Sequence, residues 1–166
     1  MGRLPRILTG RLRIRPFTFM DIDRLHALWT EPDMRRFLWD DIIISRDRAG
    51  EEVERGILNV ARHDIGYWII ESQKQDDLLG FCGFRLIEQG PDIELMYGLK
   101  RACWGRGLAT EASRAVLAWL WASTGYQRVF ARTDPPNEKS IALMQRLGMR
   151  PHAASSTLIS YVLDKE

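Results

Sequence analysis

The stretch from Trp104 to Ala112, with the sequence WGRGLATEA, combines two glycines, a basic residue between them and the start of an amphipathic helix. Glycine has no Cβ, so the backbone at Gly105 and Gly107 can approach a ligand closely. The first N–H groups of the helix lack partners within it and lie at the positive end of its dipole. Such a turn predicts a binding site for a phosphate or pyrophosphate. The alternative is a tight strand-to-helix turn without a ligand, because short glycine motifs also arise by chance.

Two common phosphate motifs do not fit this turn. A P-loop needs Gly-Lys followed by Ser or Thr at the start of the helix, and the chain has no such sequence here. A dinucleotide-binding turn needs a third glycine at the position of Thr110, and it follows the first strand of a purely parallel sheet. The ligand must therefore be identified from the surrounding elements.

Composition sets the broad class of the protein. The 166 residues are 45% hydrophobic and 28% charged, which is typical of one globular domain spanning residues 1–166. A net charge of +2 does not favour a nucleic-acid-binding protein, and no apolar run is long enough for a membrane span. Cys82 and Cys103 lack a metal-ligand spacing, so we expect no metal and a reduced protein in the cytoplasm.

The periodicity of apolar residues predicts the elements that position the glycine turn. Strands are expected at 10–16, 66–71, 78–87, 93–100, 127–133 and 157–163. Helices are expected from 18 through 29, from 45 to 62, from 109 to 124 and from 134 to 148, with a short helical turn at 34–38. Tight turns at 73–77 and 89–92 make three consecutive strands antiparallel, and the strand–helix–strand unit after them should be a right-handed parallel crossover. The sequence therefore predicts a mixed α/β sheet whose parallel part begins at the glycine turn.

Four segments, in this order along the chain, resemble one family. They are Arg11–Pro16, Leu79–Gly83, Glu94–Leu99 followed by Gly105–Ala112, and Asn137–Ser140 followed by Leu147–Met149. Together they are similar to the GNAT N-acetyltransferase superfamily, and the WGRGLATEA form looks like its RimJ/RimL branch, which acetylates the N-termini of ribosomal proteins. The resemblance implies a GNAT fold of about seven mostly antiparallel strands, splayed at the central pair 93–100 and 127–133, with four flanking helices. Many superfamily members carry Gln or Arg where this chain has Trp104.

The resemblance also implies acetyl-CoA as the cosubstrate. Its pyrophosphate would lie on the N–H groups of the glycine turn, with Arg106 and Arg101 nearby, and its pantetheine would run along strand 93–100. Gly98 would allow a bulge that splays this strand, and an N–H nearby would bind the oxyanion. The expected cofactor-binding residues are Tyr97, Gly98, Leu99, Trp104, Gly105, Arg106, Gly107, Leu108, Ala109, Thr110 and Asn137.

Two residues are the candidates for proton transfer. Glu94 is the expected general base, with partial burial raising its pKa towards the working range. The alternative is a structural glutamate bonded to backbone or to an arginine. Ser140 is the expected general acid for the CoA thiolate, although water can also supply that proton, and Tyr97 and Tyr126 are less well placed. Asn137 and Ser140 also fit helix capping.

The resemblance also implies that the acceptor binds where the first two helices, the loop between them and the last hairpin meet. That region offers Trp29, Phe37, Trp39, Asp40, Asp41, Tyr67 and Trp68. Core packing is the alternative for the aromatic residues, and Asp40 and Asp41 either attract a cationic amine or lie in a solvated loop. We interpret Cys103 as structural, because the family works by direct attack of the amine on the thioester. The expected partner is a peptide N-terminus or a small-molecule amine, and the protein is expected to be a monomer or homodimer. A CoA-binding module without catalysis is the alternative function.

Overall fold

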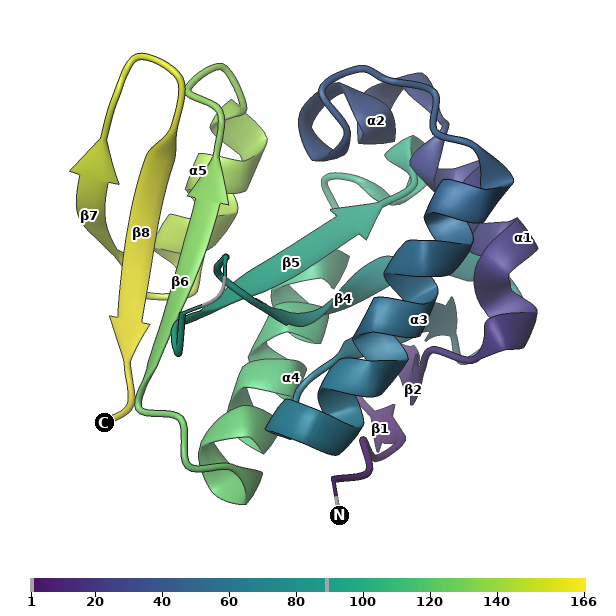
Figure 1. Ribbon diagram of the computed structural model, residues 1–166, viewed down its shortest axis with the longest axis horizontal. Coiled ribbons are helices and arrows are strands. Elements are labelled where there is room, and N and C mark those ends of the chain that lie inside the picture. The colour runs from purple at the N-terminus through teal and green to yellow at the C-terminus, as the bar shows by residue number, and fades with distance from the viewer. Residues whose placement is uncertain (1, 89) are drawn as a thin grey trace.

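The computed structural model describes residues 2–88 and 90–166 (Figure 1). The strands are β1 (Ile7–Leu8), β2 (Leu12–Pro16), β3 (Tyr67–Ser72), β4 (Leu78–Leu86), β5 (Ile93–Leu99), β6 (Arg128–Thr133), β7 (Arg150–Ala154) and β8 (Ile159–Asp164). The helices are α1 (Ile22–Trp29), α2 (Pro32–Leu38), α3 (Arg46–His63), α4 (Leu108–Ser123) and α5 (Glu138–Arg146), with short 3₁₀ turns η1 (Phe19–Asp21) and η2 (Arg101–Cys103).

The strands form one sheet in the order β1-β2-β3-β4-β5-β6-β8-β7. Among the described residues, every neighbouring pair is antiparallel except β5 and β6, which share a single parallel register pair between Glu94 and Phe130. Beyond that pair the two strands diverge, and the sheet opens into a wedge between them (Figure 1). The sequence-based prediction of a mixed, mostly antiparallel sheet splayed at this pair is confirmed.

Helices cover both faces of the sheet. The helices α1, α2 and α3 lie on one face, and α4 and α5 lie on the other (Figure 1). Side chains alternate along β5, so that Leu95 and Leu99 pack in the cluster with α4, whereas Met96 packs in the cluster with α1 to α3. Each face of β5 therefore meets a different group of helices, and this separates two halves of the site.

The structure adds two strands and one helix to the expected set. With two residues, β1 is too short for a period to be visible. All five residues of β7 are exposed, so the strand has no alternating apolar pattern. Residues 34–38, expected to be a single turn, belong to a seven-residue helix that begins at Pro32, because proline suits the first position of a helix. The described sheet and helices thus number eight strands and five α-helices. Gln89, in the expected turn 89–92, lies outside the described residues.

Candidate functional site

The glycine turn presents open backbone in front of α4. Gly105 and Gly107 have φ angles of 72° and 75°, in the left-handed region that favours glycine. No side chain caps the start of α4. In the described part of the chain, no backbone N–H from 105 to 110 donates a hydrogen bond. A Cβ added at Gly105 would meet no atom within 4 Å, so the space above the turn is open to an anion.

Four hydrogen bonds hold the turn in place. The indole N–H of Trp104 donates to the carbonyl of Leu99 at 2.9 Å, which fixes the turn to the end of β5. Glu111, in the first turn of α4, accepts hydrogen bonds from the hydroxyl of Thr9 at 2.5 Å and from Nε of Arg11 at 2.7 Å. The other end of that guanidinium donates to the carbonyl of Arg106 at 2.8 Å. The N-terminal segment around Thr9 and Arg11 thus holds the turn together with Trp104.

Positive charge surrounds the turn. Arg106 is exposed, as expected for a residue that could contact a phosphate. Arg101 is exposed too, but it pairs with Asp33 of α2 at 3.2 Å. Sequence reasoning did not single out Lys139, whose Nζ lies 3.8 Å from the ring centroid of Trp104. The place of Lys139 in the sequence, between the expected site residues Asn137 and Ser140, could have identified it. Of the remaining expected contacts, Leu108 is buried, and Ala109 and Thr110 are half-buried.

The wedge edge of β5 carries Tyr97, Gly98 and Leu99. The expected bulge at Gly98 is wrong, because β4 and β5 pair without a register shift from Leu86 and Ile93 to Gly80 and Leu99. The glycine instead permits close packing. A Cβ at Gly98 would lie 2.5 Å from the sulfur of Met34, so its absence lets α2 rest against β5.

Tyr97 and Ser140 meet across the wedge. Their hydroxyl oxygens are 2.5 Å apart, and burial raises the pKa of Tyr97 to about 12. Tyr97 is therefore better placed beside Ser140 than the sequence indicated, whereas Tyr126 donates to the carbonyl of His63. Asn137 caps α5, since its side chain accepts from the N–H of Ser140 at 3.3 Å. A protonated hydroxyl pair thus lies between β5 and α5.

Glu94 is enclosed by two arginines. Its side chain is 2% exposed, and its carboxylate accepts from Arg85 of β4 at 2.6 Å and from Arg132 of β6 at 2.8 and 3.0 Å. Burial alone would raise the pKa of Glu94, but the hydrogen bonds and charges of both arginines outweigh it and hold the pKa below its ordinary value. The expectation of a raised pKa is therefore wrong. The carboxylate joins β4, β5 and β6 at the point where the wedge opens.

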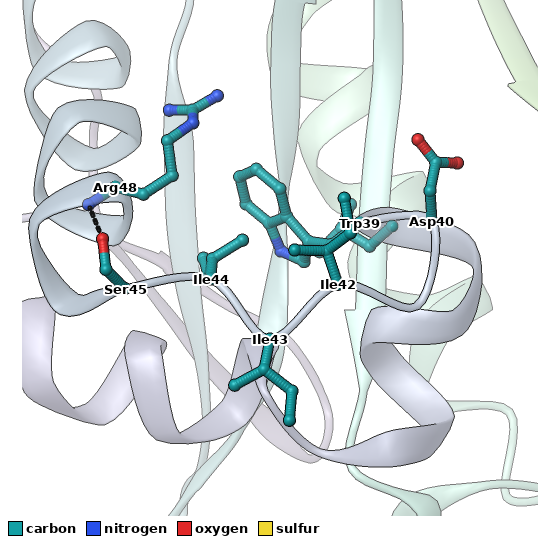
Figure 2. Close-up of a pocket in the computed structure, with 8 residues that line it drawn as sticks. Trp39, Asp40, Ile42, Ile43, Ile44, Ser45 and Arg48 are labelled. Atoms are coloured by element: carbon teal, nitrogen blue, oxygen red, sulfur yellow. Dashed lines mark hydrogen bonds between the residues drawn. The ribbon is translucent and has the colours of Figure 1, made fainter.

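The opposite face of β5 borders a narrow slot, and an open hollow adjoins this slot. The hollow has a volume of about 450 Å³ and is formed by the loop after α2 and the start of α3 (Figure 2). The slot, with a volume of about 60 Å³, continues towards the sheet. Leu38, Trp39 and Arg48 line both spaces, so the hollow and the slot adjoin. We refer to these two spaces as the hollow and the slot.

The expected acceptor residues divide between these spaces and the core. Trp29, Trp39 and Tyr67 line the slot, and Asp40 lines the hollow. The others lie elsewhere: Phe37 is half-buried outside both spaces, Trp68 is fully buried in the α4 cluster, and Asp41 pairs with Arg35 at 2.9 Å. Asp40 and Asp41 are both exposed, and the attraction of a cationic amine by these two residues stays a prediction.

Charged residues of α3 also line the slot, and sequence reasoning missed them. Glu52 is 5% exposed and accepts from the hydroxyl of Tyr67 and from Arg55, both at 3.1 Å. Arg48 and Arg85 line the slot as well. The signal was a glutamate on the apolar side of an amphipathic helix, next to Val53 in the sequence.

Contacts elsewhere in the structure concern the cysteines and the arginines of the basic strand. Cys103 is buried, which raises the pKa of its thiol, as expected for a structural residue. Arg13 and Arg15 of the basic first strand pair with Glu71 and Asp21, so their charges are neutralised locally. Among the described residues, no three His, Cys, Asp or Glu side chains are grouped as a metal site would need. The described helices include none with the length and apolar character needed to cross a membrane.

Comparisons with known proteins agree with this geometry. Residues 11–150 match the family described as the acetyltransferase (GNAT) domain. An uncharacterized N-acetyltransferase, p20 of Bacillus licheniformis, is 27% identical over 149 residues, which are 87% of this chain and 82% of the relative. An acetyltransferase structure from Agrobacterium tumefaciens superimposes with a TM-score of 0.87 at 20% identity, covering 99% of this chain and 97% of its own. RimL, a ribosomal L7/L12 alpha-N-protein acetyltransferase solved in complex with coenzyme A, superimposes with a TM-score of 0.81 at 17% identity, covering 95% and 96%. The family match spans most of the chain, and the protein belongs to the GNAT acetyltransferase family.

Proposed function

We propose that the protein is an acetyl-CoA-dependent N-acetyltransferase that moves the acetyl group to a primary amine by direct attack. The observation that carries this proposal is the open glycine turn at the start of α4, placed beside the wedge between β5 and β6. The turn offers unpaired N–H groups to an anion, and the wedge offers unpaired strand edge to an extended chain. A cosubstrate with a pyrophosphate at one end and a pantetheine arm at the other needs both. RimL, which has the same fold, was solved with coenzyme A.

The turn would bind the pyrophosphate through the N–H groups of Gly105 to Thr110. Lys139 and Arg106 would add positive charge beside them. The pantetheine arm would then follow the free edge of β5 past Tyr97, Gly98 and Leu99 towards Glu94, with Asn137 close by on α5. A backbone N–H on this edge would bind the oxyanion of the tetrahedral intermediate. Acetyl-CoA would supply the activated thioester, and the protein would fix the position of this thioester against the amine.

Protonation of the CoA thiolate is assigned to Ser140, backed by Tyr97. The two hydroxyl groups share a short hydrogen bond, and the high pKa of Tyr97 keeps it protonated at neutral pH. When Ser140 gives its proton to the thiolate sulfur, Tyr97 can return one to Ser140. We expect Ser140→Ala to lower kcat, and Tyr97→Phe to lower it by a smaller factor. Unchanged turnover in Ser140→Ala would assign the proton to water.

The general base assigned from the sequence, Glu94, requires a test of its own. Its lowered pKa keeps it ionised, as a base must be, but both oxygens already accept hydrogen bonds from arginines. A base role through water predicts that Glu94→Gln removes the acidic limb of the pH profile of kcat/KM. A role restricted to holding Arg85 and Arg132 predicts lower stability with that limb unchanged.

The family supports the reaction, acetyl transfer, more directly than it supports a particular class of acceptor. RimL carries the name of an enzyme for the N-terminus of a ribosomal protein, and the branch resemblance seen in the sequence favours a peptide N-terminus or a small amine. The protein is proposed to act as a monomer or homodimer in the cytoplasm, where its buried free thiols, Cys82 and Cys103, would stay reduced.

The decisive experiment separates catalysis from binding. Calorimetry with acetyl-CoA measures cosubstrate affinity, and release of the CoA thiol over a panel of peptides, amino acids and polyamines measures turnover. The proposal expects binding and amine-dependent thiol release together. Acetyl-CoA binding without acetylation of any amine would identify a CoA-binding module, and absence of binding would overturn the proposal entirely.

A further inference from the structure

The slot contains a buried carboxylate that borders open space. Glu52 and Glu94 both lie on the side of the sheet covered by α1 to α3, because Glu94 shares a face of β5 with Met96, which lines the slot. Glu94 lines neither space and is enclosed by two arginines. Glu52 lines the slot, where Tyr67 donates to one of its oxygens and Arg55 to the other. Of these two carboxylates, Glu52 is the one that an entering group can reach.

The size of the slot limits what can enter it. The slot is much smaller than the hollow, with a volume of about 60 Å³ against about 450 Å³. A terminal amine with its attached carbon fits this space, whereas the body of the acceptor must remain in the adjoining hollow. Aromatic side chains of Trp29, Trp39, Tyr67 and Phe81 form the walls of the slot.

Arginine side chains are prominent around the slot. Three arginines line it, Arg48, Arg55 and Arg85, and Glu52 is its single carboxylate among the described lining residues. Arg55 pairs with Glu52, and Arg85 pairs with Glu94. Arg48 stands at the junction with the hollow, where its guanidinium carbon lies 5.1 Å from the centroid of the Trp39 ring (Figure 2). Glu51 and Glu52 lie 3.5 and 3.6 Å from its Nη1, but among the described residues no acceptor forms a hydrogen bond with that atom. Of the three arginines, Arg48 is therefore the one with hydrogen-bonding capacity left for an incoming carboxylate.

Unused hydrogen-bond donors indicate what the acceptor brings. The indole nitrogen of Trp29, a residue 1% exposed, has no acceptor among the described residues, and the same holds for the indole nitrogen of Trp39 and for Nη1 of Arg48. All three residues line the slot. Buried donors without partners are uncommon in native structures, and a ligand with oxygen acceptors would satisfy them.

We propose that the acceptor is a small amine that also carries a carboxylate, as an amino acid does, with its amine facing Glu52 in the slot and its carboxylate bound by Arg48 at the junction with the hollow. The proposal rests on the proposed acetyltransferase function and narrows its substrate class. Glu52 would hold the amine beside Met96 on β5, and Arg48 would select for the anionic group. Tyr67 would keep Glu52 in position through its hydroxyl.

The test compares three matched acceptors: an apolar α-amino acid, its carboxamide, and the corresponding amine without the carboxyl group. Thiol release measures kcat and KM for each with the full-length protein. The proposal expects the free acid to have a kcat/KM roughly tenfold or more above the other two, the scale of one lost charged hydrogen bond. If a polyamine, or a peptide with no carboxylate near its N-terminal amine, has a kcat/KM as high as that of the free acid, the proposal is overturned.

Variants identify the residues responsible. Arg48→Gln should raise KM for the acid and remove the preference for it, while leaving acetyl-CoA affinity unchanged. Arg46→Gln is the control, because Arg46 lies on the same helix, pairs with Asp23 and lines neither space. Glu52→Gln should lower kcat/KM for all three acceptors and alter its pH profile, with Arg55→Gln testing whether loss of the neighbouring charge alone has that effect. An equal reduction for all acceptors in Arg48→Gln would refute the selective role.

The outcomes separate this inference from the proposed function. Acetylation of amines without a preference for the acid would overturn the inference and leave the acetyltransferase function intact. If acetyl-CoA binds but no amine is acetylated, the proposed function fails and the inference falls with it.

Discussion

A pair of glycine substitutions can test whether the turn before α4 binds the cosubstrate. Gly105 and Gly148 both adopt a left-handed conformation, with φ angles of 72° and 81°, and a Cβ added at either would meet no atom within 4 Å. Gly105 lies in the proposed pyrophosphate site. Gly148 follows the C-terminal end of α5, whereas Asn137 lies at its N-terminal end. The two positions therefore share the same backbone demand and differ in location.

Alanine should cost similar stability at both positions. A left-handed conformation is less favourable for an L-residue by about 1–2 kcal/mol, and nothing in the surroundings adds a clash. Each such kcal/mol should lower the melting temperature by about 2–4 °C for a protein of this size. Only Gly105→Ala should also lower acetyl-CoA affinity, because its Cβ would occupy the space of a phosphate oxygen. Loss of one charged hydrogen bond, about 1.5–3 kcal/mol, corresponds to a roughly 10- to 100-fold rise in Kd.

Calorimetry with acetyl-CoA and thermal unfolding, applied to both variants and the unaltered protein, measure the two effects separately. Equal destabilisation together with weaker binding in Gly105→Ala alone is the expected result. Unaltered affinity in a folded Gly105→Ala protein would refute the assignment of the turn as the pyrophosphate site. A similar loss of affinity in Gly148→Ala would show that backbone strain, and not location, had weakened binding.

Three further substitutions test the contacts around the site. Glu94→Ala should destabilise the protein by about 3 kcal/mol, because it leaves two partly buried arginines without their carboxylate. Chemical denaturation checks this, with Asp164→Asn as the control, because Asp164 also pairs with two arginines but at a half-exposed position and should change stability little. Because the pKa of Glu94 is lowered on folding, its stabilisation is present above the unfolded-state pKa of about 4.3 and disappears as the pH falls through the folded-state pKa; stability of the variant should therefore decline less in acid. Gly98→Ala should lower stability by about 1–3 kcal/mol, since its Cβ would lie 2.5 Å from the sulfur of Met34, and an unchanged denaturation midpoint would contradict this packing. Glu111→Gln should weaken the attachment of the N-terminal hairpin to α4, seen as faster hydrogen exchange in β1 and β2 with the rest of the sheet unchanged.

The sequence predicted elements with a strong local signal. The turn residues at 89–92 and the glycine turn identified β5 between them and the start of α4, because each is determined by neighbours in the chain. The helix expected from 134 to 148 ends near its predicted glycine, where the N–H of Met149 donates to the carbonyl of Met144, as in the motif that ends helices at glycine. β7 escaped prediction because its register with β8, and not its own pattern, makes it a strand.

Partners from distant segments were beyond the reach of the sequence. Arg85 precedes Glu94 by nine residues and Arg132 follows it by 38, and neither spacing indicates a contact. The rise expected in the pKa of Glu94 considered burial without these charges, which is why its direction was wrong. The pairing of Tyr97 with Ser140 could not be predicted for the same reason, since it depends on how α5 lies across the wedge.

The two faces of β5 carry different parts of the proposed site. Tyr97 and Leu99 point towards α4 and α5, where the glycine turn and Ser140 lie, whereas Met96 and Gly98 point towards α1 to α3, where the slot and Glu52 lie. If the thioester lies along the free edge of β5, the thiolate can receive its proton from one face while the amine enters from the other. The amine and the departing sulfur then need no shared proton carrier. The strand alternation itself would keep Ser140 apart from the amine held by Glu52, and a Glu52→Gln variant that altered only the acceptor steps, with acetyl-CoA affinity unchanged, would support that separation.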